Sequence, residues 1–254
     1  MKLEGDAGFQ DAVINAGSQV IRAALSADSA PLDAFLRNVV SGAPLTARGR
    51  RSIRQDDEFT MKLFVGFVEI GNSYEALDSI GRLARRAPPR VAAVSRTSYL
   101  RFCVECHLSE MYILQQRILA YLTLIVRAYR CDPHRAVLQE LVDRLTQSVK
   151  RVFSGIVMAR GAHVHEKRHG DEELDRLLML DVLAEDHPAL AQVRNAAFRE
   201  VRHKKIAWMA DNNDAVAKLL ATILGFLKPA LFLEDNSVRF PAQLRSGRSR
   251  PRGK

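Results

Sequence analysis

The sequence predicts an all-α fold, a helical bundle built around one long central helix. Three observations support this prediction. Apolar residues recur at spacings of three and four along most of the 254 residues, which is the period of an amphipathic helix. The stretch 95–129 contains no glycine or proline. The one segment that alternates like a β-strand has no evident partner strand with which to form a sheet.

The N-terminal part is expected to hold two helices and a linker. A helix over 9–27 is indicated by apolar residues at helical spacing. A short second helix, LDAFLRNVV, is expected over 32–40, between a preceding proline and a following glycine. The polar, basic stretch at about 46–57 is the best candidate for an internal linker.

The segment EFTMKLFVGFVEI, residues 58–70, is ambiguous. Every second residue is apolar at Phe59, Met61, Leu63, Val65 and Phe67, and this alternation suggests a minor β element near 59–70. The opposite face is also apolar, so a buried helix is the stronger alternative. The next segment, SYEALDSIGRLARRA, is expected to be a separate helix that two prolines close.

The clearest element is the long helix expected over about 95–129. Its apolar residues form a sustained stripe, which is typical of the spine of a bundle. The stripe consists of Leu100, Val104, His107, Met111, Leu114, Ile118, Tyr121 and Ile125.

Four further helices are expected after this spine. The first is capped by Asp132 and runs to about residue 159. The second, over 171–186, begins with acidic residues at the positive end of the helix dipole. A long helix over 188–209 and a last apolar helix over 215–232 complete the set.

These elements predict one helical domain over residues 1–232. It would contain N-terminal helices in 1–45, the linker at about 46–57 and a core over about 58–232. Residues 233–254 are expected to form a disordered basic tail.

The charge of the chain favours polyanionic partners, nucleic acid first. The net charge is +9, and the last ten residues, RSGRSRPRGK, carry five of the positive charges, which leaves 9 − 5 = +4 for the rest. A basic protein without a nucleic-acid role is the common alternative.

The composition also indicates where the protein works. No run approaches the roughly 18 apolar residues of a membrane span, and the first residues lack the pattern of a signal peptide. The three cysteines, an odd number, favour a reducing compartment. We therefore expect a cytoplasmic protein that does not associate with a membrane.

The motif CVECH, residues 103–107, has the spacing of a haem-attachment site. Attachment would require export and would disrupt the spine helix, so a packed pair of cysteines with His107 is favoured. A zinc site at Cys103, Cys106 and His107 is the other alternative, and it would need a fourth ligand.

A basic helix face beside the single tryptophan forms the second candidate site. Lysine and arginine can hold backbone phosphates, and an indole can stack a base. The alternative is a solvated face with the tryptophan in the core. The residues concerned are Arg199, Arg202, Lys204, Lys205 and Trp208.

The third candidate site lies in MARGAHVHEKRH, residues 158–169. The guanidinium of Arg160 can stabilise charge that develops on a phosphate, and the imidazole of His165 can transfer protons near neutral pH. These two groups suffice to cleave RNA without a metal. In an unbroken helix they would point about 140° apart, so a junction near Gly161 or a subunit interface would have to bring them together.

Two other interpretations of this stretch stay open. His163 and His165 could be metal ligands on a loop, although no neighbouring carboxylate–histidine pattern supports such a site. The histidines and lysines could also mark a helix terminus, where they would meet exposed carbonyl groups.

The arrangement resembles the HEPN superfamily, the helical "higher eukaryotes and prokaryotes nucleotide-binding" domains. Their signature is an arginine, four to six residues and then a histidine, and Arg160 and His165 fit the shorter spacing. The stretches 99–122, 160–183 and 208–220 also look like a group of bacterial proteins of this helical type. Gly161 stands where the family usually has a polar residue.

The resemblance implies a metal-independent endoribonuclease that acts as a homodimer, in the manner of toxins and defence effectors. Arg160 and His165 would be the catalytic pair, and His163 and Glu166 would support them. RNA would be the substrate, no cofactor would be required, and an antitoxin or defence protein could be a partner. A non-catalytic interaction or nucleotide-binding bundle is the competing hypothesis.

Overall fold

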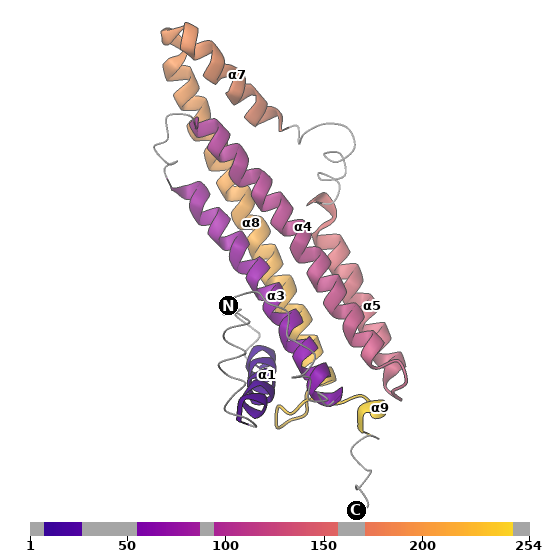
Figure 1. The fold of residues 1–254 in the computed structure, drawn as a ribbon. Helices are drawn as coiled ribbons and strands as arrows, with labels where there is room; N and C mark the ends of the chain where they lie inside the picture. The colour runs from indigo at the N-terminus through magenta and orange to yellow at the C-terminus, as the bar shows by residue number, and fades with distance from the viewer. Residues whose placement is uncertain (1–7, 27–54, 87–93, 157–170, 246–254) are drawn as a thin grey trace, which may run out of the picture. The chain divides into compact units, whose positions relative to one another are not determined.

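The described part of the chain is mostly helical. The structure, a computed structural model, describes residues 8–26, 55–86, 94–156 and 171–245. Within these ranges there is no β-strand (Figure 1). The only extended pairing there is an isolated bridge between Phe232 and Val238. The prediction of an all-α fold is confirmed.

The chain divides into two compact units, and α3, α4, α5 and α8 each contribute residues to both. In chain order the elements are α1 (Phe9–Ser26), α3 (Gln55–Arg85), α4 (Arg96–Ala128), α5 (Arg135–Val152), α7 (Glu172–Asp186), the 3₁₀ turn η2 (Pro188–Leu190), α8 (Ala191–Leu231) and α9 (Ala242–Arg245) (Figure 1). Unit 1 comprises Met1, 70–119 and 146–220, and unit 2 comprises 2–69, 120–145 and 221–254. The expected helix at 32–40 and most of the expected linker lie outside the described residues.

The proposed β element near 59–70 is wrong, because these residues belong to α3. Leu63 and Phe67 are buried, whereas Val65 between them is half exposed. A strand would place all three on one face, while a helix separates Val65 from the other two. The following helix expected from the sequence is the continuation of α3, which is 31 residues long.

The expected spine helix is confirmed in α4. Its bounds, Arg96–Ala128, agree with the expected 95–129. All eight residues of the apolar stripe are at most 3% exposed. The stripe includes two side chains with polar atoms, the imidazole of His107 and the hydroxyl group of Tyr121.

The two last helices expected from the sequence form a single helix, α8, of 41 residues. The polar run DNND at 211–214 does not interrupt it. Asn and Asp lower helix propensity by only a few tenths of a kcal/mol each, and Met209 and Val216 are buried on either side of the run. Pro229 lies inside α8 two residues before its end.

The expected disorder of the tail from residue 233 is also wrong for residues 233–245. The amide of Leu233 donates to the carbonyl oxygen of Ser237 at 2.9 Å. Further along, the amide of Ala242 donates to Oδ2 of Asp132 at 2.8 Å. Asp132 thus holds the chain before α9, and its other oxygen accepts from the amide of His134 in the turn that precedes α5.

Aromatic rings form much of the core of unit 2. Phe9 of α1 packs against Phe67 of α3 and edge-on against Phe232, with ring centroids 6.0 and 5.4 Å apart. Phe59 packs against Phe240 at 6.4 Å. These contacts connect α1, α3 and the segment that follows α8 within this unit.

In unit 1, helix α7 is fixed by a cap and by ion pairs. Oδ1 of Asp171 accepts from the amide of Leu174, which caps the helix. Arg101 of α4 forms an ion pair with Asp175. Leu174 and Leu177 are buried, so one face of α7 lies on the core of this unit.

Candidate functional site

The structure describes two of the three candidate sites, the CVECH motif and the basic face with Trp208. Arg160, His163, His165 and Glu166 lie outside the described residues. The predicted RNA-binding residues, Arg199 to Trp208, all lie on α8 in unit 1.

A cavity in unit 1 adjoins this part of α8. Its volume is about 350 Å³, within the range of small-ligand sites. Two residues at its wall, Ile156 and Asp171, are the last and first described residues around the stretch 157–170. The cavity is lined by Val104, Leu108, Val152, Gly155, Ile156, Asp171, Lys205, Trp208 and Asn212.

Trp208 forms the aromatic part of this cavity wall. Its indole meets the imidazole of His107 edge-on, with centroids 5.3 Å apart and planes at 66°. His107 is 0% exposed, and neither ring nitrogen has a hydrogen-bond partner in the described part of the chain. Burial lowers the pKa of His107 to about 4, so the imidazole behind the indole is uncharged at neutral pH.

The two lysines of the predicted site are paired with acidic residues. Lys205 contacts Asp171 at 2.6 Å and Glu173 at 2.9 Å. Burial opposes the charge on Lys205, but the two carboxylates outweigh it and raise its pKa. Lys204 lies 3.3 Å from Glu173 and 2.8 Å from Glu200. Both ammonium groups are therefore partly neutralised within unit 1.

The two arginines of the predicted site differ in their surroundings. Arg202 donates from Nε to the carbonyl oxygen of Ala84 at 3.2 Å, and from Nη2 to those of Arg85 and Arg86. It therefore stabilises the C-terminal end of α3, where carbonyl groups lack helical partners. Arg199 is exposed and has no hydrogen bond or ion pair with another described residue. Of these two, Arg199 is the cation available to a ligand.

Asn212 is a cavity residue that the sequence analysis missed. Its Nδ2 is buried and has no hydrogen-bond partner among the described residues. The helix predicted over 188–209 ends before Asn212, so the sequence does not place Asn212 on the helix face that carries Lys205 and Trp208. In the continuous α8 these three residues have spacings of three and four, and such residues share one face of a helix.

The CVECH motif is part of the core of unit 1. Cys103 and His107 are buried and Cys106 is half-buried, as the packing interpretation predicts. Burial raises the pKa of both thiols, which keeps them protonated. Within the described ranges, no three His, Cys, Asp or Glu side chains lie close enough to hold a metal ion.

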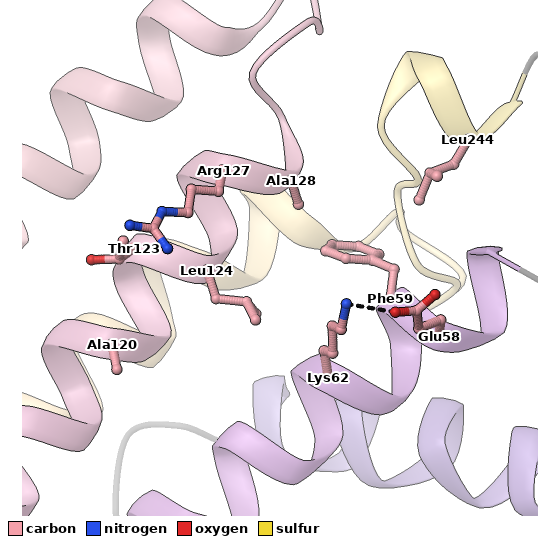
Figure 2. Close-up of a pocket in the computed structure, with 9 residues that line it drawn as sticks. All are labelled: Glu58, Phe59, Lys62, Ala120, Thr123, Leu124, Arg127, Ala128 and Leu244. Carbon is pink, nitrogen blue, oxygen red and sulfur yellow. Dashed lines mark hydrogen bonds and ion pairs between the residues drawn. The ribbon is translucent and has the colours of Figure 1, made fainter.

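A second cavity lies in unit 2, between the start of α3, the end of α4 and α9 (Figure 2). Its volume is about 700 Å³. Phe59, Leu124 and Leu244 supply an apolar surface, and Lys62 is paired with Glu58 at 2.7 Å at its edge. The guanidinium of Arg127 points away from Phe59 in Figure 2, so no unpaired charge is seen directed into this cavity among the residues drawn.

Comparisons of the chain with models of known families, with curated proteins and with solved structures gave no match. Across the described residues, no helix combines the length and the apolar character needed to cross a membrane.

Proposed function

We propose that this protein is a metal-independent endoribonuclease of the HEPN kind, with Arg160 and His165 as its catalytic pair. One observation carries the proposal. The chain leaves the described structure at Ile156 and re-enters it at Asp171, and both residues line the cavity that contains Trp208. Along the chain, the proposed pair therefore falls between two residues of one cavity wall.

Chain length limits how far the pair can lie from that wall. Arg160 follows Ile156 by four residues, so their Cα atoms are at most about 14 Å apart. His165 precedes Asp171 by six residues, which allows at most about 21 Å. Both distances are within the span of a few nucleotides of RNA.

The two side chains supply the chemistry that RNA cleavage requires. The 2′-hydroxyl oxygen attacks the adjacent phosphorus, and the bond from phosphorus to the 5′-oxygen breaks. His165 transfers the proton between the entering and leaving oxygens, and Arg160 stabilises the charge on the phosphorane. His163 and Glu166 would orient the pair. The products are a 2′,3′-cyclic phosphate and a 5′-hydroxyl.

Contacts to the RNA backbone would come from Arg199 more than from the lysines. Arg199 is exposed without a partner in the described part of the chain, whereas Lys204 and Lys205 are held by carboxylates. A homodimer, which the HEPN resemblance implies, would place two such pairs in one cleft.

The test is cleavage of a fluorescent mixed-sequence RNA in excess EDTA. Arg160→Ala and His165→Ala should each lower the rate at least about 100-fold, with cyclic phosphate ends on the wild-type products. His187→Ala is the matched control, because His187 is exposed and distant in sequence from the pair. Wild-type cleavage no faster than that of the Arg160 and His165 variants would contradict the proposal.

A second candidate, a non-catalytic interaction protein, is favoured by one surface of α7. Val182 and Leu183 follow Met179 by three and four residues and all three are exposed, so Met179 shares one helix face with both. If this face binds a second copy, Met179→Glu should convert a dimer to a monomer in analytical ultracentrifugation. The control is Val137→Glu, which changes an equally exposed apolar residue on α5. An unchanged mass for both variants would rule the face out as the dimer contact.

A further inference from the structure

We propose that the cavity of unit 1 binds a single nucleobase and does not bind a phosphate. The inference rests on the proposed function for the class of substrate, RNA, but its evidence lies in described residues alone. It assigns Trp208 to stacking and Asn212 to hydrogen bonding of the base.

The size and lining of the cavity fit a flat, partly apolar group. About 350 Å³ is enough for one base with part of its sugar. Val104, Leu108 and Val152 supply apolar contacts, and Trp208 supplies the aromatic surface on which a base of any sequence can stack.

One polar atom of the cavity residues is buried without a partner, and it is a donor. Nδ2 of Asn212 has no hydrogen-bond acceptor in the described part of the chain. A buried amide without a partner is destabilising, and when the Asn212 amide turns toward the cavity an acceptor on the ligand satisfies it. Every nucleobase carries such acceptors, as ring nitrogens or carbonyl oxygens, along its edges.

The charges around the cavity disfavour a phosphate in it. Lys205 is the one cation among the lining residues, and it already contacts Asp171 and Glu173. The full cluster contains two lysines, 204 and 205, against three acids, Asp171, Glu173 and Glu200, which gives 2 − 3 = −1. A neutral base can enter beside this cluster, whereas a phosphate would be repelled.

The stacking surface is held in place before a ligand arrives. His107 is fully buried and stays uncharged above pH of about 4 because burial lowers its pKa. It therefore supports the indole of Trp208 as a rigid, neutral ring. A support of this kind reduces the ordering that binding requires.

The single tryptophan provides the measurement. Trp208 fluorescence is followed while adenosine, uridine, ribose 5-phosphate or inorganic phosphate is added to the full-length protein. We expect the nucleosides to quench it with a Kd of about 1 mM or tighter, and the two phosphates to have no effect. Quenching by ribose 5-phosphate equal to that by adenosine, or no quenching by any nucleoside, would overturn the proposal.

Two variants locate the effect. Asn212→Leu should weaken nucleoside quenching at least about tenfold, since one buried hydrogen bond is worth about that factor. Asp211→Ala, its exposed neighbour on α8, should leave the quenching unchanged. Equal affinities of the two variants would contradict the role of Asn212. If Asn212→Leu does not fold, the wild-type protein is titrated with adenosine at low and at high salt. The quenching should be the same at both salt concentrations, because adenosine makes no phosphate contact. A steep loss of quenching at high salt would contradict the proposal.

Failure of this inference is distinct from failure of the nuclease proposal. Arg160→Ala and His165→Ala should keep wild-type nucleoside quenching while they lose RNA cleavage. Nucleoside quenching in a wild-type protein that cleaves no RNA would support the base site and rule out the nuclease proposal. RNA cleavage without nucleoside quenching would support the nuclease proposal and rule out the base site.

Discussion

The imidazole of His107 and the indole of Trp208 meet edge-on in unit 1, with ring centroids 5.3 Å apart. This contact joins the apolar stripe of α4 to the cavity wall on α8. The core therefore supports the aromatic wall of the cavity. The polar lining residues are Lys205 and Asn212 on the same face of α8 and Asp171 at the start of α7.

The burial of His107 predicts a loss of stability at acidic pH. Its pKa is about 4 in the folded protein and 6.5 in the unfolded chain, so between these values the unfolded chain binds the proton and the folded protein does not. This contribution to stability is complete above pH 6.5 and is lost as the pH falls toward 4. From pH 7 to 4.5 the loss should be about 2–3 kcal/mol.

Urea unfolding of the wild type and of His107→Phe at both pH values measures this loss. The phenylalanine keeps an aromatic ring against Trp208 but cannot bind a proton. Its free energy of unfolding should fall by about 2–3 kcal/mol less than that of the wild type over the same pH range. Parallel losses in the two proteins would mean that His107 titrates normally.

Two glycines of α3 should respond oppositely to alanine. A Cβ atom at Gly66 would lie 2.6 Å from the ring of Tyr121, whereas one at Gly71 would meet no atom within 4 Å. Tyr121 is buried and cannot move aside. Gly66→Ala should destabilise the protein by about 1–3 kcal/mol, and Gly71→Ala should stabilise it by up to about 1 kcal/mol. Thermal unfolding distinguishes these signs, and a stabilising Gly66→Ala would contradict the packing of Tyr121.

Arg202 and Arg199 form a matched pair on α8. Arg202 donates to three carbonyl groups at the end of α3, so Arg202→Ala should cost about 1–3 kcal/mol of stability. Arg199→Ala should change it by less than about 0.5 kcal/mol, yet weaken RNA binding. Chemical denaturation and RNA affinity together check the assignment. The opposite ranking in stability would show that Arg202 does not hold α3.

The ion pair between Asp171 and Lys205 should be coupled more strongly than a surface pair. Its side chains are 12% and 16% exposed, against 54% and 61% for Asp78 and Arg82. A double-mutant cycle of Asp171→Asn and Lys205→Met keeps the helix cap, because Asn also caps. We expect a coupling energy of about 1–3 kcal/mol, and about 0.5 kcal/mol or less for Asp78 and Arg82. Equal energies would mean that solvent screens both pairs alike.

The sequence was most informative where burial alone decides the structure. The stripe on α4 was predicted residue by residue, because its period is that of a helix and every member is buried. For 59–70 the favoured helix is confirmed and the possible strand is wrong. The alternation suggested a strand because Val65 is apolar yet exposed, and composition does not show which apolar residues face solvent. The tail beyond 233 was missed because hydrogen bonds such as that from Ala242 to Asp132 join residues far apart in the chain.

The site was predicted only in part. Trp208 and the basic face were found from composition, but two of the acids that pair with these lysines, Asp171 and Glu173, lie about 30 residues earlier, at the start of α7. Asn212 was missed because the polar run DNND was interpreted as the end of a helix. Whether such a run interrupts a helix depends on the apolar residues that flank it, which tertiary packing buries.

Photo-crosslinking tests most directly whether RNA binds at the cavity of unit 1. An RNA that carries 4-thiouridine is bound to the His165→Ala protein, irradiated and digested with trypsin, and the crosslinked peptide is identified by mass spectrometry. We predict crosslinks to the peptide 206–218, which contains Trp208 and Asn212. Crosslinks confined to peptides of unit 2 or to the basic residues 246–254 would contradict the account.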